Sequence, residues 1–208
     1  DAVYFSSGGD IGFGTQGTSI WKMKIGEEPK RVCTLDVKFI NRRTVTRLAT
    51  HLTMSADKRY FLVDGAFIGH WFIGLADIQT GEIKILKEFK NHYNHAQFSP
   101  VDPNLFLLAQ DWWFDQTSGE VFFLDNRIWL MNTDNTMFEP LRPMDYYGHG
   151  TESTHEWWSK DGLICWIDYK KGAFECDVKT RKTTNVWQEP LCHGHCNNDR
   201  TLWVADQS

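Results

Sequence analysis

A short pattern built around a histidine recurs four times along the chain, and it constrains the fold more than any other feature. Each copy contains a histidine, a short strand-like run, a Ser or Asn, and an Asp at a turn, and an apolar run follows. The copies are separated by roughly 40 to 60 residues, which is the repeat length of a β-propeller blade. The pattern gives equivalent places to His51, His95, His155 and His195.

A second repeating unit lies between these copies. It reads as a strand, a polar turn and a second strand, which is the outer hairpin of a four-stranded blade. It occurs at 18–28, 72–82, 127–135 and 173–180. We therefore expect an all-β fold, a β-propeller of four-stranded blades.

The two units together set the expected blade boundaries. They predict most of one blade over 1–34, a second over 45–90, a third over 93–143 with an inserted loop at 111–126, a fourth over 153–188, and the start of a fifth over 192–208. We find no linker between domains, so 1–208 is expected to be one propeller domain or a segment of one. Because an open propeller leaves bare sheet edges, we expect a partial set of blades from a longer chain.

Composition excludes several classes of function. The 208 residues carry a formal net charge of −5, which gives no electrostatic footprint for nucleic acid. No apolar run is long enough to span a bilayer, so we expect no membrane partner. The five cysteines are odd in number and irregularly spaced, which argues against a disulfide framework. Cys165 and Cys176 are expected to be small core residues.

The histidines of the repeat are candidate functional residues. In a propeller the innermost strand of each blade lines the central channel, so equivalent positions converge at one mouth. Converging imidazoles can bind a metal ion or supply a base near neutral pH. The alternative is that each histidine is merely tolerated there and bonds to a neighbouring blade. His70 is expected to face the same region, whereas His92 and His149 read as surface residues in polar loops.

The sequence His193-Gly194-His195 is a candidate metal-binding motif. Residues two apart on a strand point to the same face, so both imidazoles can share an ion. Cys192 and Cys196 flank the motif and offer softer sulfur ligands. We expect a divalent ion near His195, with His155 and His193 as companions.

Arg127 and the loop before it are further candidates. An arginine at the start of an apolar hairpin is usually a solvated strand end, but its planar fork also suits a carboxylate clamp. The loop is too long for a plain turn and too aromatic for a solvated one. Its Trp112 and Trp113 could stack on sugar rings, although packing between blades is the commoner role of tryptophan.

Three of these segments resemble the oligogalacturonate lyases, namely 95–100, 126–132 and 154–158. The resemblance implies a seven-bladed propeller with a catalytic arginine, a catalytic histidine and a divalent metal, usually manganese. Arg127 stands where that family has its arginine, and His155 stands where it has its histidine. His195 resembles the start of the blade that carries one metal-binding histidine.

The first half of the chain is more similar to the related propeller ulvan lyases. In that family two histidines, a tyrosine and an arginine act together, and a zinc ion is present. His51 and His70 match the histidines. The tyrosine would fall near 111–113, where this chain has Trp112 and Trp113.

These observations predict a polysaccharide lyase that cleaves a uronic-acid glycan, ulvan or oligogalacturonate/pectin, by β-elimination. Such chemistry needs a neutral base and a cation on the uronate carboxylate. We assign catalysis to Arg127, His155, His51 and His70. Substrate binding is assigned to His95, Trp112 and Trp113, and manganese or zinc, with calcium as a third candidate, to His155, His193 and His195.

Two other functions stay open at this stage. One is a non-catalytic TolB-like propeller that binds a protein or a glycan. The other is a propeller attached to a hydrolase domain outside this segment, since no G-x-S-x-G motif is present. Compartment follows the substrate: we expect a periplasmic or secreted protein for a polymer, and a cytoplasmic one for an oligomer.

Overall fold

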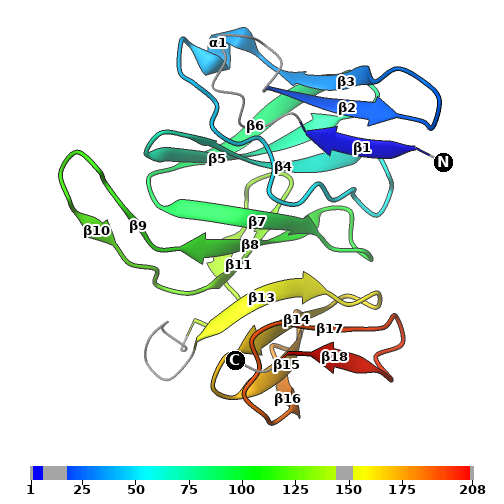
Figure 1. Ribbon diagram of the computed structural model, residues 1–208, viewed down its shortest axis with the longest axis vertical. Coiled ribbons are helices and arrows are strands. Elements are labelled where there is room, and N and C mark those ends of the chain that lie inside the picture. Colours follow the sequence, from blue (N-terminus) through cyan, green and yellow to red (C-terminus); the bar gives the residue numbers. More distant parts are fainter. Residues whose placement is uncertain (1, 7–17, 144–151, 207–208) are drawn as a thin grey trace.

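The chain folds into a row of β-sheets built from antiparallel meanders, as the repeat predicts (Figure 1). The computed structural model describes residues 2–6, 18–143 and 152–206. These residues contain one short helix, α1 (Val37–Ile40), capped by the Asp36 carboxylate, which accepts from the Lys38 amide at 2.8 Å. None of the helical structure in the described residues has the length or hydropathy of a membrane span.

The first two blades are joined into one six-stranded sheet, which the sequence did not predict. Strand β3 pairs in parallel with β6 through Thr34 opposite Glu82 and Leu35 opposite Ile83. The first meander contains β1 (Val3–Ser6), β2 (Ser19–Met23) and β3 (Lys30–Leu35). The second contains β4 (Tyr60–Phe67), β5 (His70–Asp77) and β6 (Glu82–Phe89).

The innermost segment of the second blade is not a continuous strand. Its ladder pairing with β4 is limited to two isolated bridges in the described residues, Arg47 opposite Ala66 and Met54 opposite Phe61. His51 lies between these bridges, on an irregular segment.

The third and fourth blades are complete four-stranded sheets, as expected. The third has the order β12-β11-β8-β7 and the fourth the order β13-β14-β15-β16. Their strands are β7 (His92–Phe98), β8 (Leu105–Asp111), β11 (Ile128–Asn132), β12 (Phe138–Pro140), β13 (Ser153–Trp158), β14 (Leu163–Asp168), β15 (Gly172–Asp177) and β16 (Thr183–Trp187). A fifth unit begins with the hairpin of β17 (Gly194–Cys196) and β18 (Trp203–Ala205).

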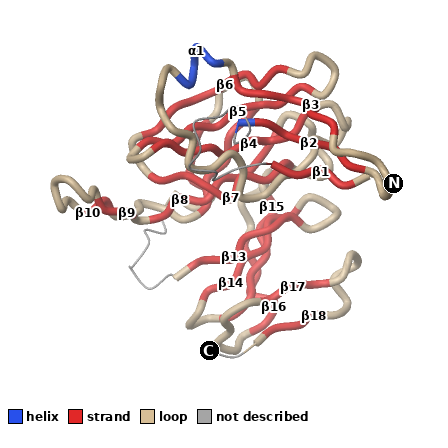
Figure 2. The backbone as a smooth tube through the Cα atoms, turned by 45° about the horizontal axis from the view of Figure 1, so that its top comes forward, coloured by secondary structure: helices blue, strands red, loops and turns tan. Residues whose placement is uncertain are grey.

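The inserted loop of the third blade forms a hairpin of its own. Strands β9 (Trp113–Phe114) and β10 (Val121–Phe122) pair with each other and project from the body of the molecule (Figure 2). The loop therefore adds a separate aromatic arm to the third blade.

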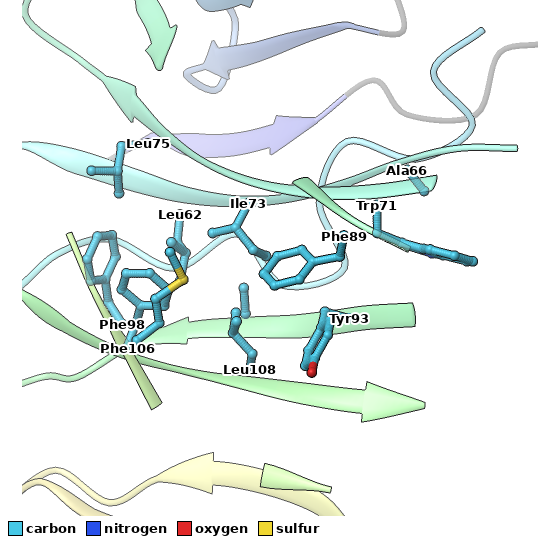
Figure 3. Packing of buried hydrophobic residues seen from close by; sticks show 12 residues of the cluster. Leu62, Ala66, Trp71, Ile73, Leu75, Phe89, Tyr93, Phe98, Phe106 and Leu108 are labelled. Carbon is cyan, nitrogen blue, oxygen red and sulfur yellow. The ribbon is translucent and has the colours of Figure 1, made fainter. Parts of the chain in front are cut away.

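Apolar cores lie between consecutive blades. Figure 3 shows one of them, in which Leu62 and Ile73 of the second blade pack against Phe106 and Leu108 of the third. Another joins the third blade to the fourth through Leu107, Leu130, Ile164 and Trp166. A third joins the fourth blade to the fifth through Trp157, Ile167 and Leu191.

The cysteines behave as the sequence predicts. All five are free thiols, and Cys165 and Cys176 are buried between blades. Burial raises the pKa of the Cys176 thiol, so it stays protonated in the core.

Candidate active site

The hydrogen bonds of the repeating turn fix which histidines are equivalent. In each copy the amide of a Ser or Asn donates to the carbonyl of the next strand, at 2.9 or 3.0 Å. These four residues are Ser55, Ser99, Ser159 and Asn197. The histidine four residues earlier is His51, His95, His155 or His193.

The fourth repeat is therefore shifted by two residues from the register expected from the sequence. His193, rather than His195, is the equivalent of the other three. The ring of His195 instead stacks on Trp157, with centroids 5.0 Å apart and planes 19° apart. Its Nδ1 lies 2.7 Å from the carbonyl of Cys196.

Two of these histidines have an unusual backbone conformation. His95 and His155 both have φ 49°, in the left-handed region. In β7 and β13 the pairing register shifts at this point, so each histidine lies in a β-bulge. Bulges re-aim side chains and are common beside active sites. The shared conformation is independent support for equivalence of the two positions.

The histidines form a row from blade to blade. The rings of His51 and His95 meet edge to face with centroids 4.9 Å apart, and those of His155 and His193 are 4.3 Å apart. His95 Nδ1 also lies 3.0 Å from Oε1 of Glu156, the residue after His155. The repeat thus brings His51, His95 and His155 together, with His193 at the end of the row.

Thr50 links the second blade to the third through hydrogen bonds next to the row of histidines. The buried carboxylate of Asp64 accepts hydrogen bonds from the Thr50 amide, at 2.8 Å, and from its hydroxyl. The same hydroxyl oxygen accepts the His95 amide at 2.8 Å. This amide is one that the bulge leaves out of the sheet ladder, so the contact compensates for the irregular backbone.

Arg127 lies at the centre of the site, and its side chain is buried rather than solvated. Its Nε donates to Glu156 Oε2 at 3.0 Å and its Nη2 to Oε1 at 3.2 Å, a bidentate pair. Its Nη1 donates to Asp111, and Nη2 lies 3.2 Å from His95 Nδ1. The arginine therefore connects the end of β8 with the inner strand of the next blade.

The carboxylate of Glu156 compensates the positive charge of the buried Arg127 guanidinium. The side chain of Glu156 is fully enclosed, at 0% exposure. Burial alone would raise the pKa of Glu156, but Arg127 and the hydrogen bonds from His95 and Arg127 outweigh it and lower the pKa from 4.5 to about 2. The carboxylate is therefore ionised at neutral pH, and Arg127 is held in one plane.

Two of the imidazoles are set to be neutral at pH 7. Burial and then His95 lower the pKa of His51 below 6.5, against the opposing effect of Glu156. Burial and then His193 lower the pKa of His155, whose Nε2 lies 3.3 Å from the Tyr169 hydroxyl. A neutral imidazole in contact with a hydroxyl can act as a general base.

A possible set of metal ligands lies at the end of the row. Among the described residues, Cys192, His193 and Asp206 have ligand atoms within 4.8 Å of one another. His193 Nδ1 is 3.0 Å from Asp206 Oδ2. His155 touches His193 but is not in this group, and His195 is turned toward Trp157. A set of sulfur, imidazole and carboxylate donors fits zinc better than manganese, because sulfur ligands select zinc and manganese prefers oxygen ligands.

Two other expected site residues lie apart from this row. His70 begins β5, and its Nε2 is 2.9 Å from Glu88 on β6. No contact joins it to His51 among the described residues. Trp113 is enclosed by stacking on Phe122 (4.5 Å, 6°) and by packing against Trp71, whereas Trp112 is 57% exposed.

His92 is not a surface residue, contrary to expectation. It begins β7 and stacks on Trp71 with centroids 4.9 Å apart. Burial and then Arg47 lower the pKa of His92 to about 4. His149 lies outside the described residues.

Several residues of the site were not expected from the sequence. Glu156 is the most important, and a signal for it exists: the other copies have Leu52 and Ala96 after the histidine, so a carboxylate breaks the repeat. Arg47 is another, because its Nε and Nη2 are buried without a hydrogen-bond partner in the described structure. Asp111, Tyr169 and Asp206 could not be found, since only the tertiary structure brings them to the histidines.

The architecture and the row of histidines define a β-propeller with a polar, partly buried site where its inner strands meet. The sequence itself matches no protein-family model and no curated protein.

Solved structures give the most specific likeness. An oligogalacturonate lyase in complex with manganese superposes with a TM-score of 0.73 at 17% identity, covering 93% of this chain and 54% of that one. An oligogalacturonate lyase from Vibrio parahaemolyticus gives 0.71 at 18% identity, covering 91% and 53%. TolB from Acinetobacter baumannii gives 0.53 at 15%, covering 82% and 38%. The chain therefore spans about half the length of the lyases, and the likeness at these identities is one of fold.

Proposed function

We propose that this chain forms part of a polysaccharide lyase that cleaves a uronic-acid glycan, ulvan or oligogalacturonate/pectin, by β-elimination. One observation carries the proposal: a buried arginine, fixed by Glu156, contacts His95 in the row of histidines, and the pKa values of His51 and His155 in the same row are lowered. The likeness to oligogalacturonate lyases supports the same reaction class. The partner is an acidic poly- or oligosaccharide.

The reaction requires two things of the protein. A base must remove the proton on the carbon next to the uronate carboxylate, and a cation must stabilise the charge that then spreads onto that carboxylate. His155 is the proposed base, and His51 is the second candidate. The Tyr169 hydroxyl, 3.3 Å from His155 Nε2, is placed to exchange a proton with it.

Arg127 is the proposed cation. Its bidentate contact with Glu156 fixes the guanidinium plane and leaves the edge toward Asp111 for a ligand. The Asp111 side chain is 29% exposed, whereas that of Glu156 is fully enclosed. A substrate carboxylate would therefore replace Asp111 and not Glu156 on the arginine.

Cys192, His193 and Asp206 would hold a divalent ion. When bound, such an ion supplies a second positive charge for a uronate oxygen. Asp206 also orients His193, since the Asp206 carboxylate accepts the His193 amide at 2.6 Å.

We expect His193→Ala to remove a bound divalent ion, because His193 lies in the group of converging donors and repeats the position of His155. The matched control is His195→Ala, which removes an imidazole two residues away that stacks on Trp157. Metal content after dialysis against zinc or manganese is measured by elemental analysis. Equal metal content in the parent and in His193→Ala would contradict the site. Loss of metal only in His195→Ala would show that His195 is the ligand, as expected from the sequence.

Replacing His155 is expected to lower turnover by about a hundredfold or more, the usual contribution of a general base. Asparagine is the preferred replacement, since the position has φ 49° and asparagine tolerates the left-handed region. His51→Asn tests the second candidate in the same assay. If His51→Asn is the impaired variant and His155→Asn is not, the roles are exchanged.

The direct test of the function is the appearance of the unsaturated uronide product. Mixing the protein with polygalacturonate or ulvan should raise the ultraviolet absorbance of the conjugated product. TolB-like propellers support the alternative, a module that binds a glycan or a protein without chemistry. Tight binding of a uronide without any rise in absorbance would favour that alternative.

A further inference from the structure

An open pocket lies between the aromatic arm and the second and third blades, and it gives a specific form to the substrate-binding role expected of Trp112 and Trp113. Its volume is about 510 Å³, within the range of small-ligand sites. Its lining contains three tryptophans and a phenylalanine, together with the polar side chains of Asp115, Gln116 and Thr117. The exposed Trp112 lies nearly parallel to Phe114, with planes 22° apart.

The pocket is linked to the arginine site by residues in contact with one another. His92, which lines it, is the cross-strand partner of Asp111, and Asp111 binds Arg127. Asn94 links the two, since its amide donates to Asp111 at 2.6 Å and lies 3.3 Å from His92 Nε2. A chain of sugars that runs from Arg127 along these residues would reach the pocket.

The chemistry of the lining selects what binds there. A sugar ring has an apolar face that stacks on an indole and hydroxyl edges that bond to a polar rim. The lining residues include no lysine or arginine and do include Asp115. A uronate carboxylate would meet a like charge there and find no cation, which is unfavourable.

We propose that this pocket is a subsite for an uncharged sugar next to the uronate at Arg127. The inference rests on the proposed function and narrows it. The substrate is then a glycan that alternates uronate with an uncharged sugar, and not a homopolymer of uronates. Trp112 is the stacking platform, and Asp115 excludes the charged ring.

Two tetrasaccharides test this by calorimetry on the intact chain. One alternates glucuronate with N-acetylglucosamine, and the other is tetragalacturonate. The parent should bind the alternating one about tenfold more tightly, which is about the contribution of one good stacking contact. Trp112→Ala should lose that difference. Phe123→Ala is the matched control, since Phe123 is 77% exposed on the same arm and does not line the pocket.

Asp115→Asn tests the charge separately. Asn keeps an acceptor for the Thr117 amide, which donates to Asp115 at 2.8 Å, and so preserves the turn. The Asp115→Asn variant should bind tetragalacturonate severalfold more tightly than the parent does. Its affinity for the alternating tetrasaccharide should be unchanged. The inference is overturned if the parent does not prefer the alternating sugar, if Trp112→Ala binds like the parent, or if Asp115→Asn changes nothing.

The outcomes separate this inference from the lyase proposal. If the alternating sugar binds through Trp112 but no unsaturated product forms from either sugar, the lyase proposal fails and the subsite stands. If product forms and Trp112→Ala cleaves and binds like the parent, the subsite fails and the lyase proposal stands.

Discussion

Arg127→Ala is expected to lower turnover of a uronide by about a hundredfold or more, the usual effect of losing one preorganised electrostatic contact. The charge on the substrate carboxylate grows in the transition state, so kcat should fall more than KM rises. Arg127→Lys should also be strongly impaired. It keeps a positive charge but loses the fork that now meets Glu156 through two nitrogens.

Arg59→Ala is the matched control for Arg127. Arg59 forms an exposed ion pair with Asp77 at 3.0 Å, and such solvent-screened pairs contribute little to stability. The activity of Arg59→Ala should equal that of the parent. Circular dichroism and thermal unfolding establish whether each variant folds. A folded Arg127→Ala that cleaves ulvan and oligogalacturonate at the parental rate would remove this arginine from the mechanism.

Glu156→Gln is expected to cause the largest loss of stability, about 3–5 kcal/mol at neutral pH. The reason is that Arg127, with a side chain only 8% exposed, would lose its one fully enclosed counter-charge and keep only the partly exposed Asp111. Urea unfolding at pH 7 measures the difference. Glu139→Gln is the control, because Glu139 pairs with Arg181 at the surface and is 49% exposed.

The pH dependence of the unfolding free energy is a second test of the role of Glu156. Its pKa is lowered from 4.5 to about 2, so its ionised form stabilises the fold fully above pH 4.5. That contribution is lost as the pH falls from 4.5 through about 2. The stability difference between parent and Glu156→Gln should therefore shrink over this window. A difference that is the same at pH 7 and near pH 2 would show that the ion pair is not its cause.

Much of the fold could be predicted, because a propeller repeats both its turn and its hairpin. Ser55 and Ser159 each bond to an Asp two residues on and receive the amide of the following strand, so one turn recurs in sequence and in structure. The pairing of β3 with β6 could not be predicted. It depends on two parallel contacts between blades, and such contacts have no local pattern.

The site was harder to predict, because its polar contacts cross between blades. The repeat placed His51, His95 and His155 in one row, and it singled out Arg127. In the fourth copy the repeat led to the wrong histidine, because the H-x-H motif contains two of them. The hydrogen bond of the turn residue Asn197 identifies His193 as the equivalent one. Whether Arg127 faces a carboxylate of the protein or solvent cannot be seen from its own segment, since Glu156 lies 29 residues away.

The roles of the aromatic residues also depend on contacts between blades that the sequence does not reveal. The sequence assigned Trp112 and Trp113 to one role, but Trp112 precedes the short strand β9 and Trp113 begins it. Trp113 packs inward against Trp71, and only Trp112 is left exposed. His92 was misassigned because its partner, Trp71, belongs to another blade.

The placement of apolar cores between blades has a consequence for any attempt to divide this protein. Leu107 and Leu130 of the third blade are buried in a core that they share with Ile164 and Trp166 of the fourth. Excising one blade would therefore uncover an apolar face on each side of the cut, and no single blade is an autonomous folding unit. Recombinant fragments should keep adjacent blades in pairs, so that at least one core stays closed.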